Sequence, residues 1–133
     1  VFGLIAIPAM GAYNSAKFAV RGFTEALRQE LDFADIGVSC SVVCPGGVKT
    51  NIARSSRMVI DPAYGKTRED AVKEFDRAAL TTPSKAAKII IRGIKGNKRR
   101  ILVGPDAYAI DAMQRMAPNG YQRLIQRFAT PKK

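Results

Sequence analysis

The sequence predicts an α/β fold in which this chain forms the C-terminal part of a doubly wound parallel sheet, and the sheet is incomplete in this chain. Two short β-rich runs, at residues 38–44 and 100–103, are the predicted strands, and amphipathic helical patterns separate and flank them. Strands that alternate with helices are typical of parallel sheets covered on both faces. Because such a sheet has about five or more strands, these two account for only part of one.

A long helix is predicted first, over residues 14–34, because apolar residues recur there at steps of three and four. The predicted core-facing stripe is Ala16, Ala19, Val20, Phe23, Ala26, Leu27, Leu31 and Ala34. The opposite face carries two pairs at the spacing of exposed helical ion pairs, Arg21 with Glu25 and Arg28 with Asp32.

Tyr13 and Lys17 stand four residues apart at the start of this helix, so their side chains share one face. Free tyrosine has a pKa of about 10 and is a poor acid or base at neutral pH, unless a neighbouring positive charge stabilises its anion. Lys17 supplies such a charge in one interpretation, which makes Tyr13 a general acid/base. In the other interpretation the two residues are an ordinary surface pair.

The predicted strand at residues 38–44 follows the turn at Ile36 and Gly37 and ends at the sequence Pro45, Gly46, Gly47. It carries no charge, which is typical of a buried parallel strand. Ligands of open α/β sheets bind beyond the carboxyl ends of the strands. Residues 45–50 are therefore a candidate ligand turn, in which Val48 offers backbone groups and Thr50 a hydroxyl, and the alternative is a plain turn.

Residues 51–66 have no regular pattern and follow the candidate ligand turn, as lids often do. The apolar residues of this segment are either the lining of a substrate pocket or anchors of a loop. They are Met58, Val59, Ile60 and Tyr64. The pocket interpretation predicts a lipophilic alcohol or ketone as substrate.

Four helical regions and one strand complete the predicted order. A helix covers residues 67–80, and the next opens at Thr82 and Pro83 and closes at residues 96–97, because threonine is a favoured cap and proline a favoured first residue. Its predicted buried stripe is Ala87, Ile90, Ile91 and Ile94, and its basic side is Lys85, Lys88, Arg92 and Lys95. After the strand at residues 100–103 come helical segments at 106–116 and 119–128.

These blocks, in this order and spacing, resemble the short-chain dehydrogenase/reductase family of NAD(P)-dependent oxidoreductases. The resemblance rests on Tyr13-x-x-x-Lys17, on the helix text from Lys17 to Leu31, and on Pro45-Gly46-x-Val48-x-Thr50. It implies a Rossmann-like fold, with Tyr13 as general acid/base and Lys17 lowering its pKa and binding the nicotinamide ribose. It also implies that residues 45–50 contact the nicotinamide of NAD or NADP, and that hydride passes directly between this ring and an alcohol or carbonyl substrate.

Other parts of the family pattern do not occur in this sequence. A glycine-rich dinucleotide turn and an Asn-Ala-Gly segment are missing, and the family's catalytic serine would stand one residue before Val1. We therefore expect residues 1–133 to be the C-terminal portion of one Rossmann-like domain, which needs its other half to fold and to bind cofactor. Residues 1–50 would carry the active-site helix and turn, 51–82 the substrate loop and lid helix, and 83–133 the last helices and strand.

Composition raises a second hypothesis. Lysine and arginine total 22 against 11 acidic residues, a net charge of +11. Such a surface favours an anionic partner, and a non-catalytic member of the fold would bind an anionic membrane surface through its basic C-terminal face. Nucleic acid is not expected, because no recognition motif or interleaved aromatic pattern accompanies the basic residues.

Cysteine usage and the absence of histidine limit the remaining possibilities. No metal site is expected, since the chain has two cysteines and no histidine. Cys40 and Cys44 would lie about 13 Å apart on a strand, beyond disulfide reach. Free thiols favour a cytoplasmic protein. The family resemblance further implies a homo-oligomer, a dimer or a tetramer.

Overall fold

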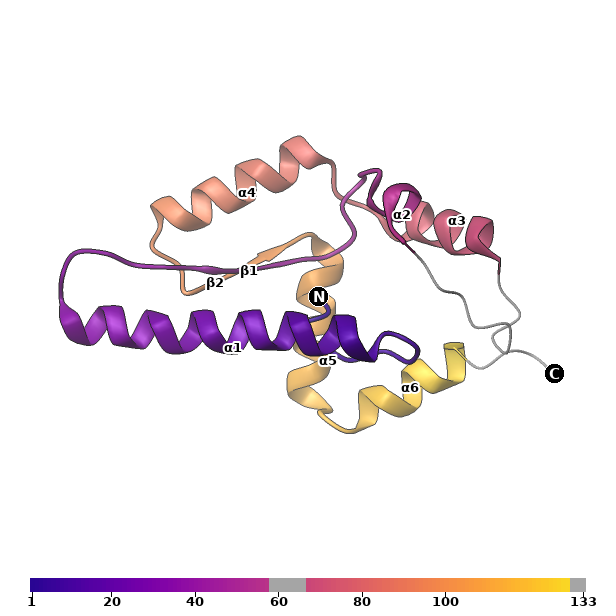
Figure 1. The fold of residues 1–133 in the computed structure, drawn as a ribbon, viewed down its shortest axis with the longest axis horizontal. Helices are drawn as coiled ribbons and strands as arrows, with labels where there is room; N and C mark the ends of the chain where they lie inside the picture. Colours follow the sequence, from indigo (N-terminus) through magenta and orange to yellow (C-terminus); the bar gives the residue numbers. More distant parts are fainter. Residues whose placement is uncertain (58–66, 130–133) are drawn as a thin grey trace.

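The computed structural model describes residues 1–57 and 67–129, which form a mixed α/β fold around a small parallel sheet (Figure 1). In chain order the elements are α1 (Gly11–Ala34), β1 (Val42–Pro45), α2 (Ile52–Ser55), α3 (Arg68–Ala78), α4 (Pro83–Lys95), β2 (Arg100–Val103), α5 (Pro105–Met116) and α6 (Gly120–Ala129). β1 and β2 pair in parallel, with Val42 opposite Arg100 and Pro45 opposite Val103. The predicted mixture of helices with a parallel sheet is confirmed.

Helices cover both faces of the two-stranded sheet, with α4 on one side and α1 on the other (Figure 1). Two apolar clusters fill these layers: Leu4, Val42 and Cys44 form one, and Ala86, Ile101 and Val103 form the other. Neighbouring strand residues belong to different clusters, because successive side chains of a strand point to opposite faces. The sheet is thus buried on both sides, as a parallel sheet requires.

The predicted orientation of the first helix is wrong. α1 begins at Gly11 instead of Asn14, and much of its apolar stripe faces outward, with Phe23 71% exposed. The inward side carries Arg28, which is 6% exposed and donates from Nη1 to the carbonyl oxygen of Cys40 at 3.0 Å. Leu27 and Leu31 are half-buried. Hydrogen bonds from Arg21 to the carbonyl of Gly3, before the helix, and from Arg28 to the carbonyl of Cys40, after it, therefore set the rotation of α1. The predicted homo-oligomer stays a prediction.

The first strand is shorter than predicted and displaced toward the turn. It covers Val42–Pro45, and residues 38–41 are not strand. A strand is defined by its partner, and β2 pairs only with these four residues. Before them, the carbonyl of Cys40 accepts from Arg28 instead of from a neighbouring strand. Cys40 and Cys44 are both free thiols, as predicted.

α4 has the predicted ends but a different buried side. Thr82 caps it, accepting from the N–H of Lys85, and Pro83 is its first residue. The helix buries Ala86 and Gly93, whereas Ile91 and Ile94 are exposed, so the predicted stripe is largely wrong. A β-carbon on Gly93 would lie 2.6 Å from the Ile101 side chain, which means that this glycine lets α4 approach β2 closely.

The remaining elements follow the predicted order with small differences. Thr67 and Asp70 form a capping box at the start of α3, and the short helix α2 lies in a region predicted to be irregular. α5 and α6 begin one residue away from their predicted starts, and Tyr121 of α6 is buried and accepts from the N–H of Ala6. No described helix combines the length and the apolar character needed to span a bilayer.

Residues 1–133 alone are expected to unfold broadly on heating, without a sharp cooperative transition. The described sheet has two strands, and Val20, Phe23 and Phe33 expose large apolar surface to water, which leaves little buried surface to stabilise the fold. Far-UV circular dichroism during a thermal melt measures this. A single steep transition would contradict the expectation.

Candidate active site

Tyr13 and Lys17 lie on the first turns of α1 and share one face, as predicted. The Lys17 Nζ lies 5.2 Å from the centroid of the Tyr13 ring, within the range of a cation–π interaction. The ring of Phe2 also packs on Tyr13, with centroids 5.5 Å apart and an interplanar angle of 72°. Tyr13 is 41% exposed, so a ligand can reach it while Lys17 and Phe2 restrict its position.

Asn14, next to Tyr13, is a buried polar residue that the sequence pattern did not distinguish. Its Nδ2 donates to the carbonyl oxygen of Ile7 at 2.9 Å, which joins the start of α1 to the segment before it. Its Oδ1 is buried and has no hydrogen-bond partner among the described residues. An asparagine beside the tyrosine was visible in the sequence, but spacing alone does not separate a buried from an exposed asparagine.

The turn after β1 is held by backbone and side-chain hydrogen bonds. The N–H of Gly46 donates to the carbonyl oxygen of Val103 at 2.8 Å, and the N–H of Gly47 donates to Oδ2 of Asp106 at 2.6 Å. Thr81 then pairs with the turn in parallel, donating to the oxygen of Gly47 and accepting from the N–H of Lys49. Neither Thr81 nor Asp106 was predicted, because both are distant in sequence.

A polar hollow of about 450 Å³ adjoins the turn. It is lined by Lys49, Thr50, Asn51, Arg54 and Asp76. Arg54 and Asp76 form an ion pair within it, and the hydroxyl of Thr50 donates to the carbonyl oxygen of Val48 at 3.3 Å. The predicted Thr50 therefore lines a site whose charged and hydroxyl groups suit a polar, anionic ligand.

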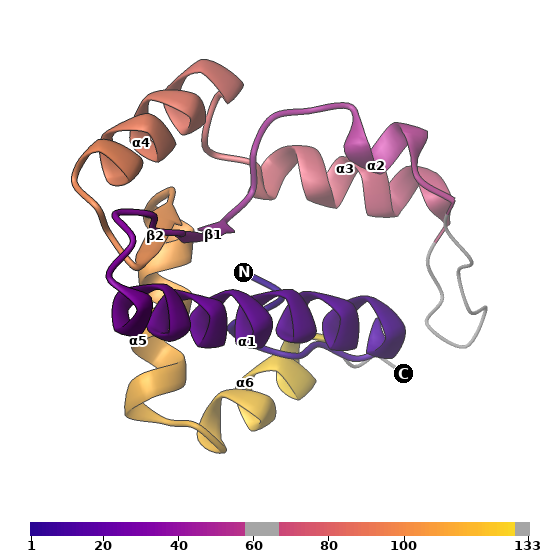
Figure 2. The same ribbon diagram turned by 60° about the vertical axis from the view of Figure 1, so that its left-hand side comes forward.

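The tyrosine and the turn lie at the same end of the fold. α1 and β1 run in opposite directions, so the first turns of α1 and the carboxyl end of β1 point the same way (Figures 1 and 2). Among the described residues, no hydrogen bond or ring contact joins Tyr13 or Lys17 directly to residues 45–50. A ligand lying along this end would have to bridge the two groups.

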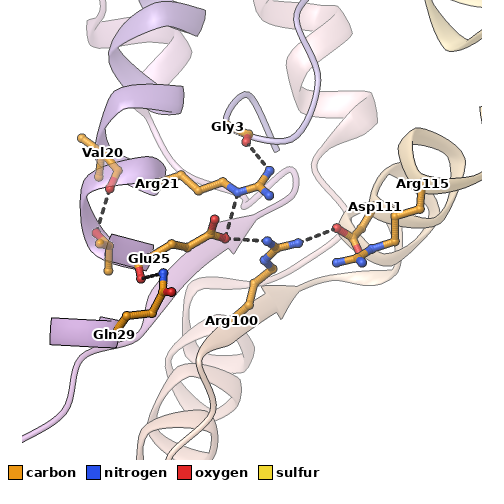
Figure 3. A network of polar contacts seen from close by, with 9 residues as sticks. Gly3, Val20, Arg21, Glu25, Gln29, Arg100, Asp111 and Arg115 are labelled. Atoms are coloured by element: carbon orange, nitrogen blue, oxygen red, sulfur yellow. Dashed lines mark hydrogen bonds and ion pairs between the residues drawn. The ribbon is translucent and has the colours of Figure 1, made fainter. Parts of the chain in front are cut away.

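A network of ion pairs fixes α1 relative to β2 and α5 (Figure 3). Arg100 of β2 lies between two carboxylates, donating from Nη2 to Glu25 and from Nη1 to Asp111 at 3.2 Å. Arg21 binds Glu25 at 3.0 Å, and Arg115 binds Asp111 at 2.7 Å. Arg21 and Glu25, which were predicted to form an exposed helical face, thus take part in the contacts that hold the helix bearing Tyr13.

The network changes the acidity of its carboxylates. Burial alone would raise the pKa of the Glu25 carboxyl, but hydrogen bonds from Arg100 and Arg21 outweigh burial and hold the pKa of Glu25 below its ordinary value. The pKa of Asp111 is lowered in the same way, since the bonds and charges of Arg115 and Arg100 exceed the effect of burial. Both carboxylates are therefore stabilised in their charged form.

Residues 1–60 match the family model for short chain dehydrogenase. The matched segment contains Tyr13, Lys17 and the whole turn after β1. The chain belongs to the short-chain dehydrogenase family. The resemblance inferred from the sequence is confirmed.

Relatives of this short-chain dehydrogenase chain align with most of its length. It is 46% identical over 126 residues to SadH of Mycobacterium tuberculosis, an oxidoreductase by name, and the alignment covers 94% of this chain and 44% of SadH. It is 38% identical over 112 residues to the oxidoreductase BOA17 of Botryotinia fuckeliana, covering 79% of this chain and 40% of BOA17. The chain thus spans less than half the length of these relatives. No solved structure matches it significantly.

The family assignment leaves the individual residue roles as predictions. Tyr13, Lys17, Pro45, Gly46, Val48 and Thr50 are all among the residues that the structure describes. The predicted substrate-pocket residues Met58, Val59, Ile60 and Tyr64 lie outside the described residues.

Acid is expected to destabilise the whole protein partly through the Arg100 network. A carboxylate whose folded pKa is lowered contributes stability above its unfolded pKa, of about 4, and loses it as the pH falls through the folded value. The free energy of unfolding should therefore fall between about pH 5 and pH 3, and Arg100→Met should flatten that fall, because Glu25 and Asp111 each lose a partner. Urea unfolding at a series of pH values measures the slope.

Arg92→Met is the matched control, because Arg92 is exposed on α4 and outside this network. It should retain the pH dependence of the wild type. The network has no such role if Arg100→Met and Arg92→Met show the same slope as the wild type.

Proposed function

We propose that the whole protein carrying this chain is an NAD- or NADP-dependent oxidoreductase that interconverts an alcohol and a ketone or aldehyde, with Tyr13 as general acid/base. The observation that carries the proposal is the position of the Lys17 ammonium, 5.2 Å from the centroid of the accessible Tyr13 ring. The accessible hydroxyl of this ring can exchange a proton with a substrate oxygen, and a neighbouring ammonium suits the charge that develops on that hydroxyl during the exchange. The family membership supports the same chemistry.

The proton step follows from the two side chains. In reduction, the Tyr13 hydroxyl donates its proton to the carbonyl oxygen of the substrate, and Lys17 stabilises the phenolate that remains. In oxidation, the phenolate removes the proton of the alcohol. The nicotinamide cofactor, when bound, supplies or accepts the hydride at the substrate carbon.

The end of the fold beyond β1 offers groups that fit a nicotinamide dinucleotide. Among the described residues, the N–H of Val48 donates to no acceptor, although the neighbouring N–H groups of Gly47 and Lys49 do. A free backbone donor suits the carboxamide of a nicotinamide. The N–H of Val48 would therefore hold the nicotinamide end of the cofactor at the turn.

We further propose that β1 and β2 belong to a larger doubly wound sheet in the whole protein. Helices on both faces of a parallel pair support this, since such layers are typical of doubly wound folds. The substrate is proposed to be lipophilic, on the apolar character of the sequence that follows α2.

Tyr13→Phe in the whole protein is expected to reduce turnover about a hundredfold to ten-thousandfold while largely retaining cofactor affinity. The substitution removes the proton-exchanging hydroxyl but keeps the ring that contacts Lys17 and Phe2. Steady-state kinetics with NAD(H) and NADP(H), over alcohols and ketones of increasing apolar length, measure turnover.

Tyr108→Phe makes the same chemical change on an exposed tyrosine of α5 and should leave turnover unchanged. Near-normal turnover of Tyr13→Phe would remove Tyr13 from the mechanism. Within the same panel, far better efficiency with short polar substrates would contradict the lipophilic substrate.

A second candidate function is association with an anionic membrane surface through α4. Its exposed side carries four cations, namely Lys85, Lys88, Arg92 and Lys95. Beside them Ile91 and Ile94 are 52% and 58% exposed, so charge and apolar surface are adjacent, as in helices that lie on bilayers. This candidate predicts lipid binding that does not depend on cofactor turnover.

Wild-type protein is then expected to float with vesicles of phosphatidylcholine and phosphatidylserine but not with phosphatidylcholine alone. The double variant Lys88→Glu with Arg92→Glu should lower the partition about tenfold or more, because each basic residue near the surface contributes about 1 kcal/mol. Lys73→Glu with Arg77→Glu on α3 is the matched charge change. Equal losses in both double variants, or no flotation of the wild type, would exclude the α4 surface.

A further inference from the structure

Asp106, the second residue of α5, reaches across the fold to the turn after β1. Its Oδ2 accepts the N–H of Gly47 at 2.6 Å, although the two residues are 59 positions apart. Acidic residues in the first turn of a helix commonly bind the N–H groups of their own helix. No side-chain bond caps the start of α5. The carboxylate thus accepts a hydrogen bond from the turn and caps no N–H of its own helix.

The space around this carboxylate is shaped by two glycines. A β-carbon on Gly46 would lie 2.1 Å from both carboxylate oxygens, and one on Gly104 would lie 2.6 Å from Oδ1. Gly104 also has φ of +97°, which side chains rarely adopt. The absence of a side chain at Gly46 thus leaves the space that the Asp106 carboxylate occupies.

The second carboxylate oxygen has no compensating partner. Oδ1 of Asp106 is buried and accepts no hydrogen bond from the described residues. A buried polar atom without a partner costs about 1–3 kcal/mol, and more when it is charged, so such atoms call for an explanation beyond packing. The contact that the structure shows for this carboxylate is the hydrogen bond to the turn.

Asp106 acts together with two other contacts that fix the turn. Gly46 donates to Val103, and Thr81 pairs with the backbone on either side of Val48. The N–H groups of Gly46, Gly47 and Lys49 therefore each have an acceptor within the chain, namely Val103, Asp106 and Thr81. The N–H of Val48 remains as the donor that a ligand can use.

We propose that Asp106 is a positioning residue for the nicotinamide side of the cofactor site. By accepting the Gly47 N–H, its carboxylate fixes the peptide between Gly46 and Gly47 and presents the Val48 N–H to the nicotinamide. This role rests on the proposed function. It deepens that function by separating recognition of the nicotinamide from recognition of the rest of the dinucleotide.

The test compares two ligands on the whole protein. Dissociation constants are measured for NADH and NADPH by nucleotide fluorescence and for ADP-ribose, which lacks the nicotinamide, by competition or calorimetry. Asp106→Ala should weaken the better-bound reduced dinucleotide about tenfold to a hundredfold, since a hydrogen bond to a charged group is lost. ADP-ribose should bind within about twofold of the wild type, because it does not reach the turn.

Glu30→Ala is the matched control, since it also removes a carboxylate and Glu30 is exposed on α1, outside the Arg100 network. It should leave the ratio of the two affinities unchanged. Asp106→Asn keeps an acceptor oxygen at the same length and should give an intermediate ratio. If Asp106→Ala does not fold, the ratio for Asp106→Asn decides the matter.

The outcomes separate the inference from the function on which it rests. Wild-type protein that binds neither dinucleotide overturns the oxidoreductase proposal, and the role of Asp106 with it. Wild-type protein that binds a dinucleotide, with Asp106 variants that lose both ligands equally or lose neither, overturns only the positioning role.

Discussion

The parallel pairing of β1 with β2 is the constraint on which the other contacts depend. Parallel strands end at the same edge, so the residues after Pro45 and those after Val103 must meet there. The hydrogen bond from Gly46 to Val103 continues the pairing by one step beyond the strands. The turn motif and the start of α5 are consequently neighbours, although more than fifty residues separate them.

Charge, more than apolar packing, attaches α1 to this sheet. Single ion pairs near the surface contribute little, because solvent screens them and ordering the side chains costs entropy. Arg100, however, binds carboxylates from α1 and α5 at once, and Arg28 reaches a backbone carbonyl from a buried position. Hydrogen bonds of this kind are directional, so they fix the rotation of α1 and with it the direction of Tyr13.

Local chemistry made some elements predictable from the sequence. Thr82 and Pro83 mark the start of α4, Thr67 caps α3, and the spacing of Tyr13 and Lys17 places them on one helical face, because each feature depends on residues within one turn. The same local patterns identified the family. These predictions did not depend on which parts of the fold the helices contact.

Features that depend on partners elsewhere in the fold were not predictable. An apolar stripe shows that a helix has two sides, but not which of them meets the sheet, so Phe23 and Ile94 were assigned to the wrong side. The start of β1 depends on where β2 begins, and the bond of Asp106 to Gly47 on how β2 is aligned. In the candidate site, the motif residues were visible in the sequence, whereas the groups that hold them were not.

The β-bridge between Val48 and Thr81 holds together the two ends of the segment that separates them. Thr81 is buried, and its backbone bonds to Gly47 and Lys49 fix both ends of that segment independently of what lies between. Substitutions at exposed positions of α3 can therefore be made without shifting the sheet register or Tyr13. Changes on that helix leave the groups that would carry the chemistry in their places.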